Sequence, residues 1–123
     1  MFTFLLDECI PWRLASAIAT WNAENPEYAI DALSVGDPPD LPLGSADPDI
    51  LRWAERNGRA VVTTDYSTMP GHLTDLLAAG GHLAGMILPR PAANLGELVQ
   101  SLVVIAFAGS PDDLFDNLTY IPL

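Results

Sequence analysis

Apolar residues along the chain recur at two different spacings, and their succession predicts alternating strands and helices. Residues 2–6 form a short run that is almost wholly apolar, as in a parallel strand covered on both faces. Four apolar residues then share one helical face, at spacings of four, four and three: Ile10, Leu14, Ile18 and Trp21. This helix should begin near Pro11 and fade over residues 22–25. The chain is therefore predicted to open with a strand followed by a helix.

The same alternation continues to the end of the sequence. Further strands are predicted over residues 28–35, 60–64, 83–88 and 119–123. Further helices are predicted over residues 47–57, from Ser67 or Thr68 to residue 79, over 94–108 and, briefly, after Ser110. Such alternation is typical of a parallel sheet with helices on both faces. The predicted fold class is therefore α/β, with three α/β/α layers and a mostly parallel central sheet of four to five strands.

Two local signals lie between the second and third predicted strands. Residues 36–46 are rich in Pro, Gly and Asp and predict an irregular loop, and loops of that length often carry function. The triplet Asp47-Pro48-Asp49 predicts a helix start, with the first aspartate at the N-cap and the proline at the first helical position. Gly58 is a natural stop for this helix.

The composition is that of one well-packed globule. A chain of 123 residues can bury a core without staples, so residues 1–123 are expected to form a single domain. Half of the residues are apolar and 17% are charged, which argues against a disordered chain. Cys9 is the sole cysteine, so no internal disulfide can form. No stretch resembles a signal peptide or reaches the roughly 20 apolar residues of a membrane span, so a soluble, cytoplasmic protein is expected.

The charge balance is strongly acidic and changes the functional picture. The formal net charge is −11, and all five cationic side chains are arginines. A nucleic-acid binder usually carries a basic face, whereas this surface should repel polyanions and attract cations or a basic protein. The one basic cluster is Arg52, Arg56 and Arg59, whose usual meaning is a solvated helix face. Any phosphodiester would therefore need a bound metal to hold it.

Four acidic residues are expected to meet at the carboxyl edge of the predicted sheet. Asp7 and Glu8 follow the first strand, Asp65 follows the third, and Asp47 opens the helix before it. In parallel sheets, ligands bind beyond the carboxyl ends of strands, where the strand order reverses. Gathered carboxylates repel one another unless a hard cation neutralises them, and Mg²⁺ or Mn²⁺ takes oxygen ligands. If the first and third strands are neighbours, these four acids predict a metal site suited to phosphodiester hydrolysis.

Simpler interpretations of the same residues remain open at the level of sequence. Asp47 could be a plain N-cap, and Asp65 could close a turn. Glu8 points the opposite way to Asp7 along the strand, so it could be solvated. Arg13 lies one turn into the first helix, where it could reach a substrate phosphate or simply face solvent.

Other chemistries fit the sequence less well. A phospho-acceptor receiver domain also carries acids after its first and third strands, but it uses a late lysine, and this chain has no lysine. A dinucleotide-binding enzyme would place a G-x-G-x-x-G motif after the first strand, where residues 7–11 offer no glycine. His72 and His82 have no paired nucleophile at a suggestive spacing and predict neither a triad nor a zinc site.

Three segments resemble a known family in their order and spacing. They are Phe4-Leu5-Leu6-Asp7-Glu8-Cys9-Ile10-Pro11, then Ala46-Asp47-Pro48-Asp49-Ile50-Leu51, then Val61-Val62-Thr63-Thr64-Asp65. They look like a small family of PIN-like nucleases related to the toxins of bacterial toxin–antitoxin pairs. The likeness extends along the whole chain, to Ser67-Thr68-Met69-Pro70 and the final Tyr120-Ile121-Pro122-Leu123. The resemblance implies a PIN-like fold.

The resemblance also implies an activity, metal-dependent cleavage of RNA. Asp7, Asp47 and Asp65 fall where the family's acidic residues fall. Many PIN-like proteins carry a further acid two residues after the last of these, and here that position is Ser67. Ser67 and Arg13 are the residues expected to contact the substrate. The expected partners are RNA, a small antitoxin-like protein and a second copy in a homodimer; the alternative is an inert PIN-like interaction protein without the chemistry.

Overall fold

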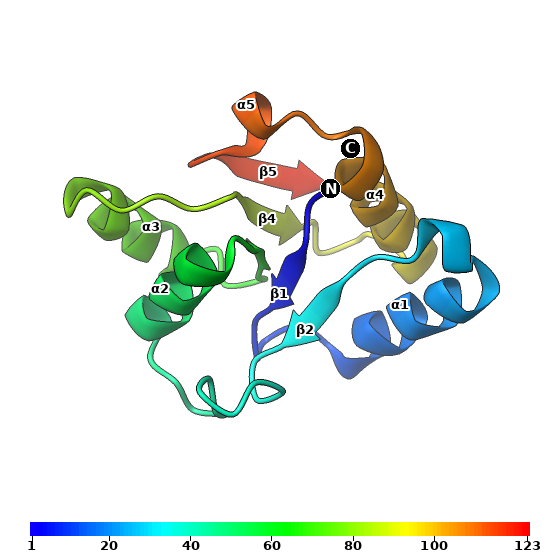
Figure 1. The fold of residues 1–123 in the computed structure, drawn as a ribbon, viewed down its shortest axis with the longest axis horizontal. Coiled ribbons are helices and arrows are strands. Elements are labelled where there is room, and N and C mark those ends of the chain that lie inside the picture. Colours follow the sequence, from blue (N-terminus) through cyan, green and yellow to red (C-terminus); the bar gives the residue numbers. More distant parts are fainter.

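The computed structural model, which describes residues 1–123, contains one five-stranded sheet in which every neighbouring pair of strands is parallel (Figure 1). The strands are short: β1 (Phe4–Leu6), β2 (Ala32–Ser34), β3 (Ala60–Val62), β4 (Met86–Pro89) and β5 (Leu118–Ile121). Their order across the sheet is β2-β1-β3-β4-β5. The predicted α/β class, the parallel sheet and the adjacency of the first and third strands are confirmed.

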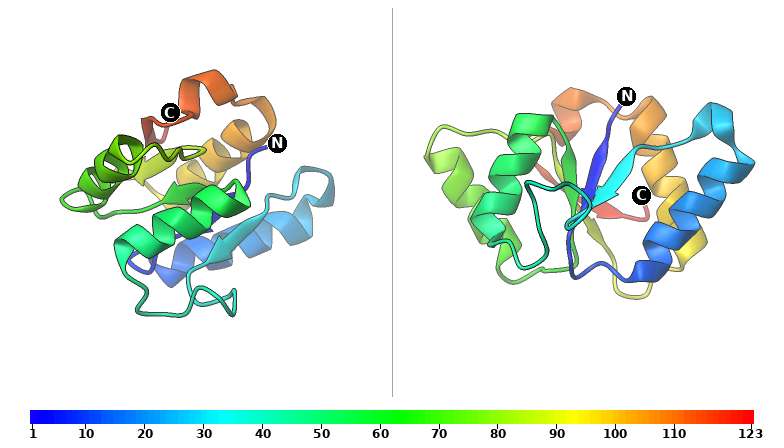
Figure 2. Two further views of the ribbon diagram at one scale, coloured as in Figure 1. Left: turned by 60° about the vertical axis from the view of Figure 1, so that its left-hand side comes forward. Right: turned by 60° about the horizontal axis from the view of Figure 1, so that its bottom comes forward.

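Helices cover both faces of the sheet and complete the three predicted layers. One face carries α1 (Trp12–Glu24) and α4 (Leu95–Ala108), and the other carries α2 (Asp47–Asn57) and α3 (Met69–Ala78), as Figure 2 shows. A 3-10 turn, η1 (Pro26–Tyr28), precedes β2, and the short α5 (Pro111–Leu114) precedes β5. None of these helices combines the length and the apolar character needed to cross a membrane.

Side chains alternate along the central strands and therefore point into two separate cores. Leu6 is buried in the core beneath α1 and α4, whereas Leu5 is buried in the core beneath α2 and α3. Leu5 lies opposite Val61, so β1 and β3 are matched in register. The residues that follow the two strands, Asp7 and Thr63, consequently leave the sheet side by side on the face of α2 and α3.

The strand order reverses between β1 and β3. From β1 the chain moves outward to β2, the edge strand on one side, and all later strands are added on the other side. Connections that leave neighbouring strands in opposite directions open a crevice at the carboxyl ends of those strands. This topology places the end of β1 next to the end of β3 at such a crevice.

All five strands are shorter than their predicted ranges: β3, predicted to reach residue 64, ends at Val62, and two others begin late. The strand predicted over residues 28–35 begins only at Ala32, because the preceding residues form η1 and pairing with β1 starts there. The strand predicted over residues 83–88 begins at Met86. Leu83 is held apart from the sheet because its backbone N–H and C=O are both bonded to Asp116.

The predicted N-cap of α2 is also wrong. Ala46 occupies the N-cap, and its carbonyl accepts the backbone N–H groups of Asp49 and Ile50. Asp47 is the first helical residue, Pro48 the second, and no side chain caps this helix. The helix itself and its stop at Gly58, in a left-handed conformation, are as predicted. The carboxylate of Asp47 is therefore not engaged at its own helix terminus.

Candidate active site

Asp7 is the buried carboxylate at the centre of the site. It follows β1 directly, and only 8% of its surface is exposed. Its Oδ1 accepts a hydrogen bond from the backbone N–H of Glu8 at 2.8 Å, and its Oδ2 accepts one from the hydroxyl of Thr63 at 2.8 Å. A buried charge is costly unless it is paired or hydrogen-bonded. No arginine or histidine forms an ion pair with Asp7, so these hydrogen bonds are its main support.

Thr63 is a positioning residue that sequence reasoning did not select. Its side chain is completely buried, and its hydroxyl also accepts a 3.1 Å hydrogen bond from the backbone N–H of Asp65. The Sγ of Cys9 lies 3.4 Å from the same hydroxyl and 3.5 Å from Oδ2 of Asp7. Thr63 thus joins the carboxyl ends of two neighbouring strands. The signal that could have found it is the register of β1 against β3, which places it opposite Asp7.

Asp47 brings a second carboxylate towards Asp7 from the first turn of α2. Its pKa is raised above the ordinary value of 3.8, first by burial and next by the negative charge of Asp7. The charges of Asp65 and Glu8 act in the same direction, whereas His72 acts in the opposite one. Asp7, Asp65 and Glu8 are therefore near enough to act on the carboxylate of Asp47 at the carboxyl edge of the sheet.

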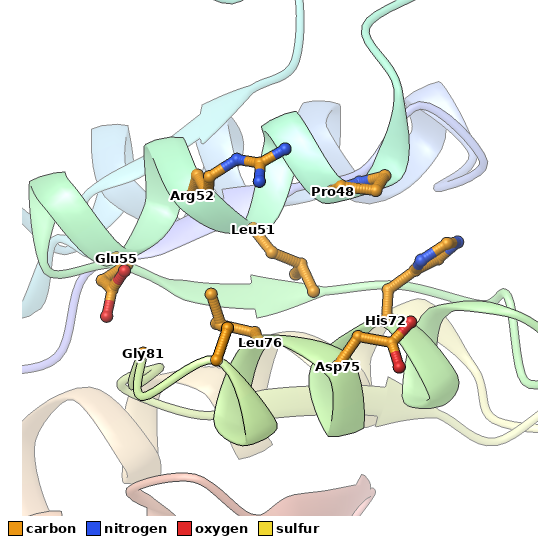
Figure 3. Close-up of a pocket in the computed structure, with 9 residues that line it drawn as sticks. Pro48, Leu51, Arg52, Glu55, His72, Asp75, Leu76 and Gly81 are labelled. Atoms are coloured by element: carbon orange, nitrogen blue, oxygen red, sulfur yellow. The ribbon is translucent and has the colours of Figure 1, made fainter.

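His72 faces Asp47 from α3 and was not predicted to belong to the site. Its Nε2 lies 3.6 Å from Oδ2 of Asp47, and each side chain is 31% exposed. Figure 3 shows His72 at one end of a groove between α2 and α3, where Leu51 and Leu76 point toward each other; the groove has a volume of about 280 Å³. Only the packing of the two helices creates this pair, so no spacing in the sequence could have indicated it.

Asp65 lies at the same edge, but its carboxylate is used by its own chain. Its Oδ1 accepts the backbone N–H groups of Ser67 at 3.2 Å and Thr68 at 2.9 Å, and its Oδ2 accepts the Thr68 hydroxyl. These bonds, led by the Thr68 hydroxyl, lower the pKa of Asp65. Thr68 occupies the N-cap of α3, as one of the two predicted positions, but its side chain makes no capping hydrogen bond, and Asp65 closes the turn instead.

Glu8 is exposed and turned away from Asp7, toward the irregular loop. Its Oε1 accepts a hydrogen bond from the backbone N–H of Gly44 at 2.6 Å. Gly44 has a φ of +83°, which favours glycine at this turn. The loop predicted over residues 36–46 is present. The hydrogen bond between Glu8 and Gly44 holds the C-terminal part of this loop near the acidic residues. A metal-binding role for Glu8 would have to compete with this hydrogen bond.

The two residues predicted to contact substrate are both exposed near the carboxyl edge. Arg13 lies in the first turn of α1, where its guanidinium carbon is 5.7 Å from the centre of the Trp12 ring. Ser67 lies in the turn before α3 and donates its backbone N–H to Asp65. Neither side chain takes part in a hydrogen bond within the protein, so both are available to a ligand.

The predicted basic cluster is dispersed by the fold. Arg59 opens β3 at the opposite edge of the sheet, where it makes a two-pronged ion pair with Asp31 at 2.8 and 3.1 Å. Arg52 pairs with Asp49 at 3.2 Å. Arg56 is the one member without an acidic partner. Arg52 and Arg56 are exposed on α2, as expected of a solvated helix face, and the ion pairs of Arg52 and Arg59 leave only Arg56 without an acidic partner.

The acidic side chains fit a hydrated cation better than a closed cage. No group of three or more His, Cys, Asp or Glu side chains is arranged to hold a metal directly. Asp7 and Asp47 nevertheless bring two carboxylates together, and Mg²⁺ is commonly held by one or two carboxylates with waters completing its shell. Asp65 and Glu8 contribute negative charge from slightly farther away.

Comparison with known proteins identifies no relative of this chain. No protein-family model matches it, and neither a curated protein nor a solved structure does so. The resemblance to PIN-like nucleases consequently rests on the three sequence segments that carry it. What the chain does must be argued from its carboxyl-edge residues.

Proposed function

We propose that the chain is a metal-dependent ribonuclease of the PIN-like type. The observation that carries the proposal is the approach of a buried carboxylate, Asp7, to a second carboxylate, Asp47, whose pKa is raised partly by that charge. Repulsion of this kind is unfavourable for the fold, and perturbed carboxylates gather at functional sites. A divalent cation between the two would relieve it.

The cation is expected to be Mg²⁺ or Mn²⁺, held by Asp7 and Asp47, with Asp65 and Glu8 acting through its waters. When bound, it would polarise a phosphoryl oxygen and lower the pKa of a bound water. It would also attract a polyanion that the net charge of −11 otherwise repels. Oxygen-rich donor sets favour these hard cations.

The other residues of the site have positioning and binding roles. Thr63 fixes the carboxylate of Asp7 through its hydroxyl, and His72 flanks the carboxylate of Asp47. Arg13 and Ser67 are placed to meet phosphate oxygens of the substrate. An arginine can bind a phosphate through two parallel hydrogen bonds, which fixes orientation as well as charge.

The biological role that we propose is that of the toxin in a toxin–antitoxin pair, acting on RNA in the cytoplasm. The segments that resemble PIN-like toxins support this role. The acidic surface supports a small antitoxin-like partner with basic segments, because opposite charges favour association. A homodimer is proposed on the resemblance alone.

A second candidate is an inert PIN-like interaction protein. Two observations favour it. The carboxylate of Asp65 is fully engaged by the turn before α3, and no three side chains are arranged as metal ligands. Ser67 also stands where many PIN-like proteins have a further acid. Such a protein would bind its partner without binding a cation or cleaving RNA.

The experiment that separates the two is cleavage of varied RNA and DNA strands by the purified full-length chain, with Mg²⁺, with Mn²⁺ and with a chelator. Asp47→Asn is expected to reduce cleavage at least about 100-fold, because loss of even an indirect metal partner costs 10–100-fold. Asp49→Asn is the matched control. It makes the same charge change on the same helical turn, at an exposed aspartate that pairs with Arg52.

Cleavage that requires the cation, is lost in Asp47→Asn and persists in Asp49→Asn would support the nuclease. An equal loss in both variants would indicate an effect of net charge rather than of the site. No cleavage by the parent with either cation, together with tight binding of a small protein partner, would leave the inert interaction protein as the function.

A further inference from the structure

Trp12 is the most exposed aromatic residue of the protein, with 73% of its surface in solvent. It opens α1, a few residues after Asp7, and with Asp7 and Leu43 it lines a hollow of about 210 Å³. The other tryptophans are packed, since Trp53 is buried and Trp21 is half-buried. Indole rings usually contribute to stability by burial. An indole left in water beside the acidic site is therefore better explained by binding than by folding.

One face of this indole is already occupied. The guanidinium of Arg13 lies over the ring, with its central carbon 5.7 Å from the ring centre, as in a cation–π contact. No aromatic or cationic side chain of the protein lies over the other face. A flat group could stack there and complete a sandwich with Trp12 in the middle.

The distribution of the arginines singles out the same edge of the sheet. Two arginines without an acidic partner, Arg13 and Arg90, lie at the carboxyl ends of the strands. Arg90 follows β4, and its guanidinium lies over the ring of Tyr120, 5.4 Å from the ring centre. The third unpaired arginine, Arg56, lies in the last turn of α2, which ends at the opposite edge. Two arginines that lie over aromatic rings and lack an acidic partner are thus found at the same edge of the sheet as the acidic residues.

We propose that Trp12 is a stacking platform for one nucleobase of the RNA strand, and that Arg13 and Arg90 contact its phosphates at the carboxyl edge of the sheet. This inference rests on the proposed nuclease function and describes how its substrate is held. Stacking suits a protein of net charge −11, because a base is uncharged and the repulsion falls on the phosphates alone. The platform requires an unpaired nucleotide but no particular base, since every base has a π-face.

The test measures binding separately from cleavage. The full-length chain with Mg²⁺ is titrated with a short single-stranded RNA whose linkages are phosphorothioates, which resist hydrolysis. Trp12→Ala is expected to weaken binding about 5- to 100-fold, and Trp12→Phe much less, because the ring is kept. Bound RNA should quench tryptophan fluorescence in the parent but not in Trp12→Phe. Phe107→Ala is the control for loss of an exposed ring, since Phe107 is 45% exposed at the end of α4.

The arginines are tested through the salt dependence of the same affinity. Arg13→Ala and Arg90→Ala are each expected to reduce the slope of log affinity against log salt by about 0.7, the value for one phosphate contact on a single strand. Arg56→Ala is the matched control, because it removes the same charge from an arginine that also lacks an acidic partner. Its slope should equal that of the parent.

Unchanged affinity in Trp12→Ala, or quenching that persists in Trp12→Phe, would overturn the platform, and so would a parent chain that binds no RNA. Thermal melting checks that each variant is folded. Cleavage is scored independently with ordinary RNA. If the parent binds RNA through Trp12 but does not cleave it, the platform is supported and the nuclease function is overturned. If Trp12→Ala cleaves RNA and binds it as tightly as the parent does, the nuclease function is supported and the platform is overturned.

Discussion

Two aspartate–histidine contacts lie at opposite ends of the molecule and differ in how their charges are compensated. In the turn before β5, Asp116 accepts the backbone N–H of Leu83 at 2.7 Å and meets Nδ1 of His82 at 2.8 Å. Burial alone would raise the pKa of Asp116, but these hydrogen bonds outweigh it and lower the pKa. At the carboxyl edge, Asp47 faces His72 at 3.6 Å, and its pKa is raised.

The difference shows that the same pair of residue types, aspartate and histidine, can meet in surroundings that shift the aspartate pKa in opposite directions. Asp116 accepts hydrogen bonds from the Leu83 N–H and from His82, and these favour its ionised form, which stabilises the turn. Burial, and next the charge of Asp7, raise the pKa of Asp47, so its ionised form is disfavoured in the folded chain. The proposed function would stabilise this ionised form by adding a positive charge beside it. A cation is the simplest candidate.

The largest expected effect on stability comes from removing the carboxylate of Asp116, which is hydrogen-bonded on both oxygens. Asp116→Ala should lower the free energy of unfolding by about 2–5 kcal/mol. Of this, about 1–3 kcal/mol follows from the unpaired Leu83 N–H, and about 1–2 kcal/mol from placing alanine at a φ of +62°. Asp47→Ala should change stability by at most about 0.5 kcal/mol. Urea unfolding measures the stability of both variants. A greater loss of stability in Asp47→Ala than in Asp116→Ala would contradict the contrast drawn between the two aspartates.

Thr63→Val tests whether the acidic site depends on its one buried donor. The change keeps the shape of the side chain but leaves the carboxylate of Asp7 without its hydroxyl partner. We expect a loss of about 1–3 kcal/mol in stability and, if the chain is a nuclease, a 10–100-fold loss in cleavage. Thr64→Val is the control, because that hydroxyl makes only a 3.4 Å contact with the carbonyl of Cys9. Similar losses in both variants would deny Thr63 a special role.

Added Mn²⁺ should stabilise the parent more than it stabilises Asp47→Asn. A ligand that binds only the folded state at ten times its Kd adds about 1.4 kcal/mol. Asp116→Asn, which lies outside the site, should gain as much from Mn²⁺ as the parent does. Thermal melting with and without the cation measures the gain. Equal gains in all three proteins would show that Asp47 does not bind the metal.

The two aspartates should also respond to pH in opposite directions. Asp47 holds its proton more readily in the folded chain, so its contribution turns unfavourable as pH rises from 3.8 through the raised pKa. Metal-free Asp47→Asn should therefore gain stability over the parent as pH rises through that window. Asp116 contributes stability above pH 3.8 that is lost as pH falls through its lowered pKa, so the deficit of Asp116→Asn should vanish in acid. Stability curves of the same slope would contradict these assignments.

The fold could be predicted from the sequence where its signals are local. The apolar runs at residues 2–6 and 60–64 and the helical face of α1 depend on spacing alone, and all three are found near their predicted places. Predictions fail where a distant segment decides the outcome. Residues 28–31 do not join the strand because β1 pairs only from Phe4 onward, and Leu83 stays outside β4 because Asp116 holds it.

The candidate site shows the same division. Asp7 could be selected because an acid that directly follows an apolar strand must lie near buried surface. Thr63 and His72 could not, because the first matters through strand register and the second through the packing of α2 against α3. The direction of each carboxylate is equally hidden from the sequence. Asp65 was predicted to end its strand as Asp7 does, but β3 ends at Val62, and the oxygens of Asp65 accept hydrogen bonds from its own turn.

The acidic site is assembled from distant parts of the chain, and this has a consequence for its synthesis. Asp7 and the hydroxyl that holds it are 56 positions apart, and His72 comes later still. Synthesis proceeds from the N-terminus, so the first carboxylate leaves the ribosome well before its partners. Every nascent chain that stops short of α3 therefore lacks the completed site. If the proposed function holds, the ribosome is therefore not exposed to the activity of its own nascent chain until α3 has been made.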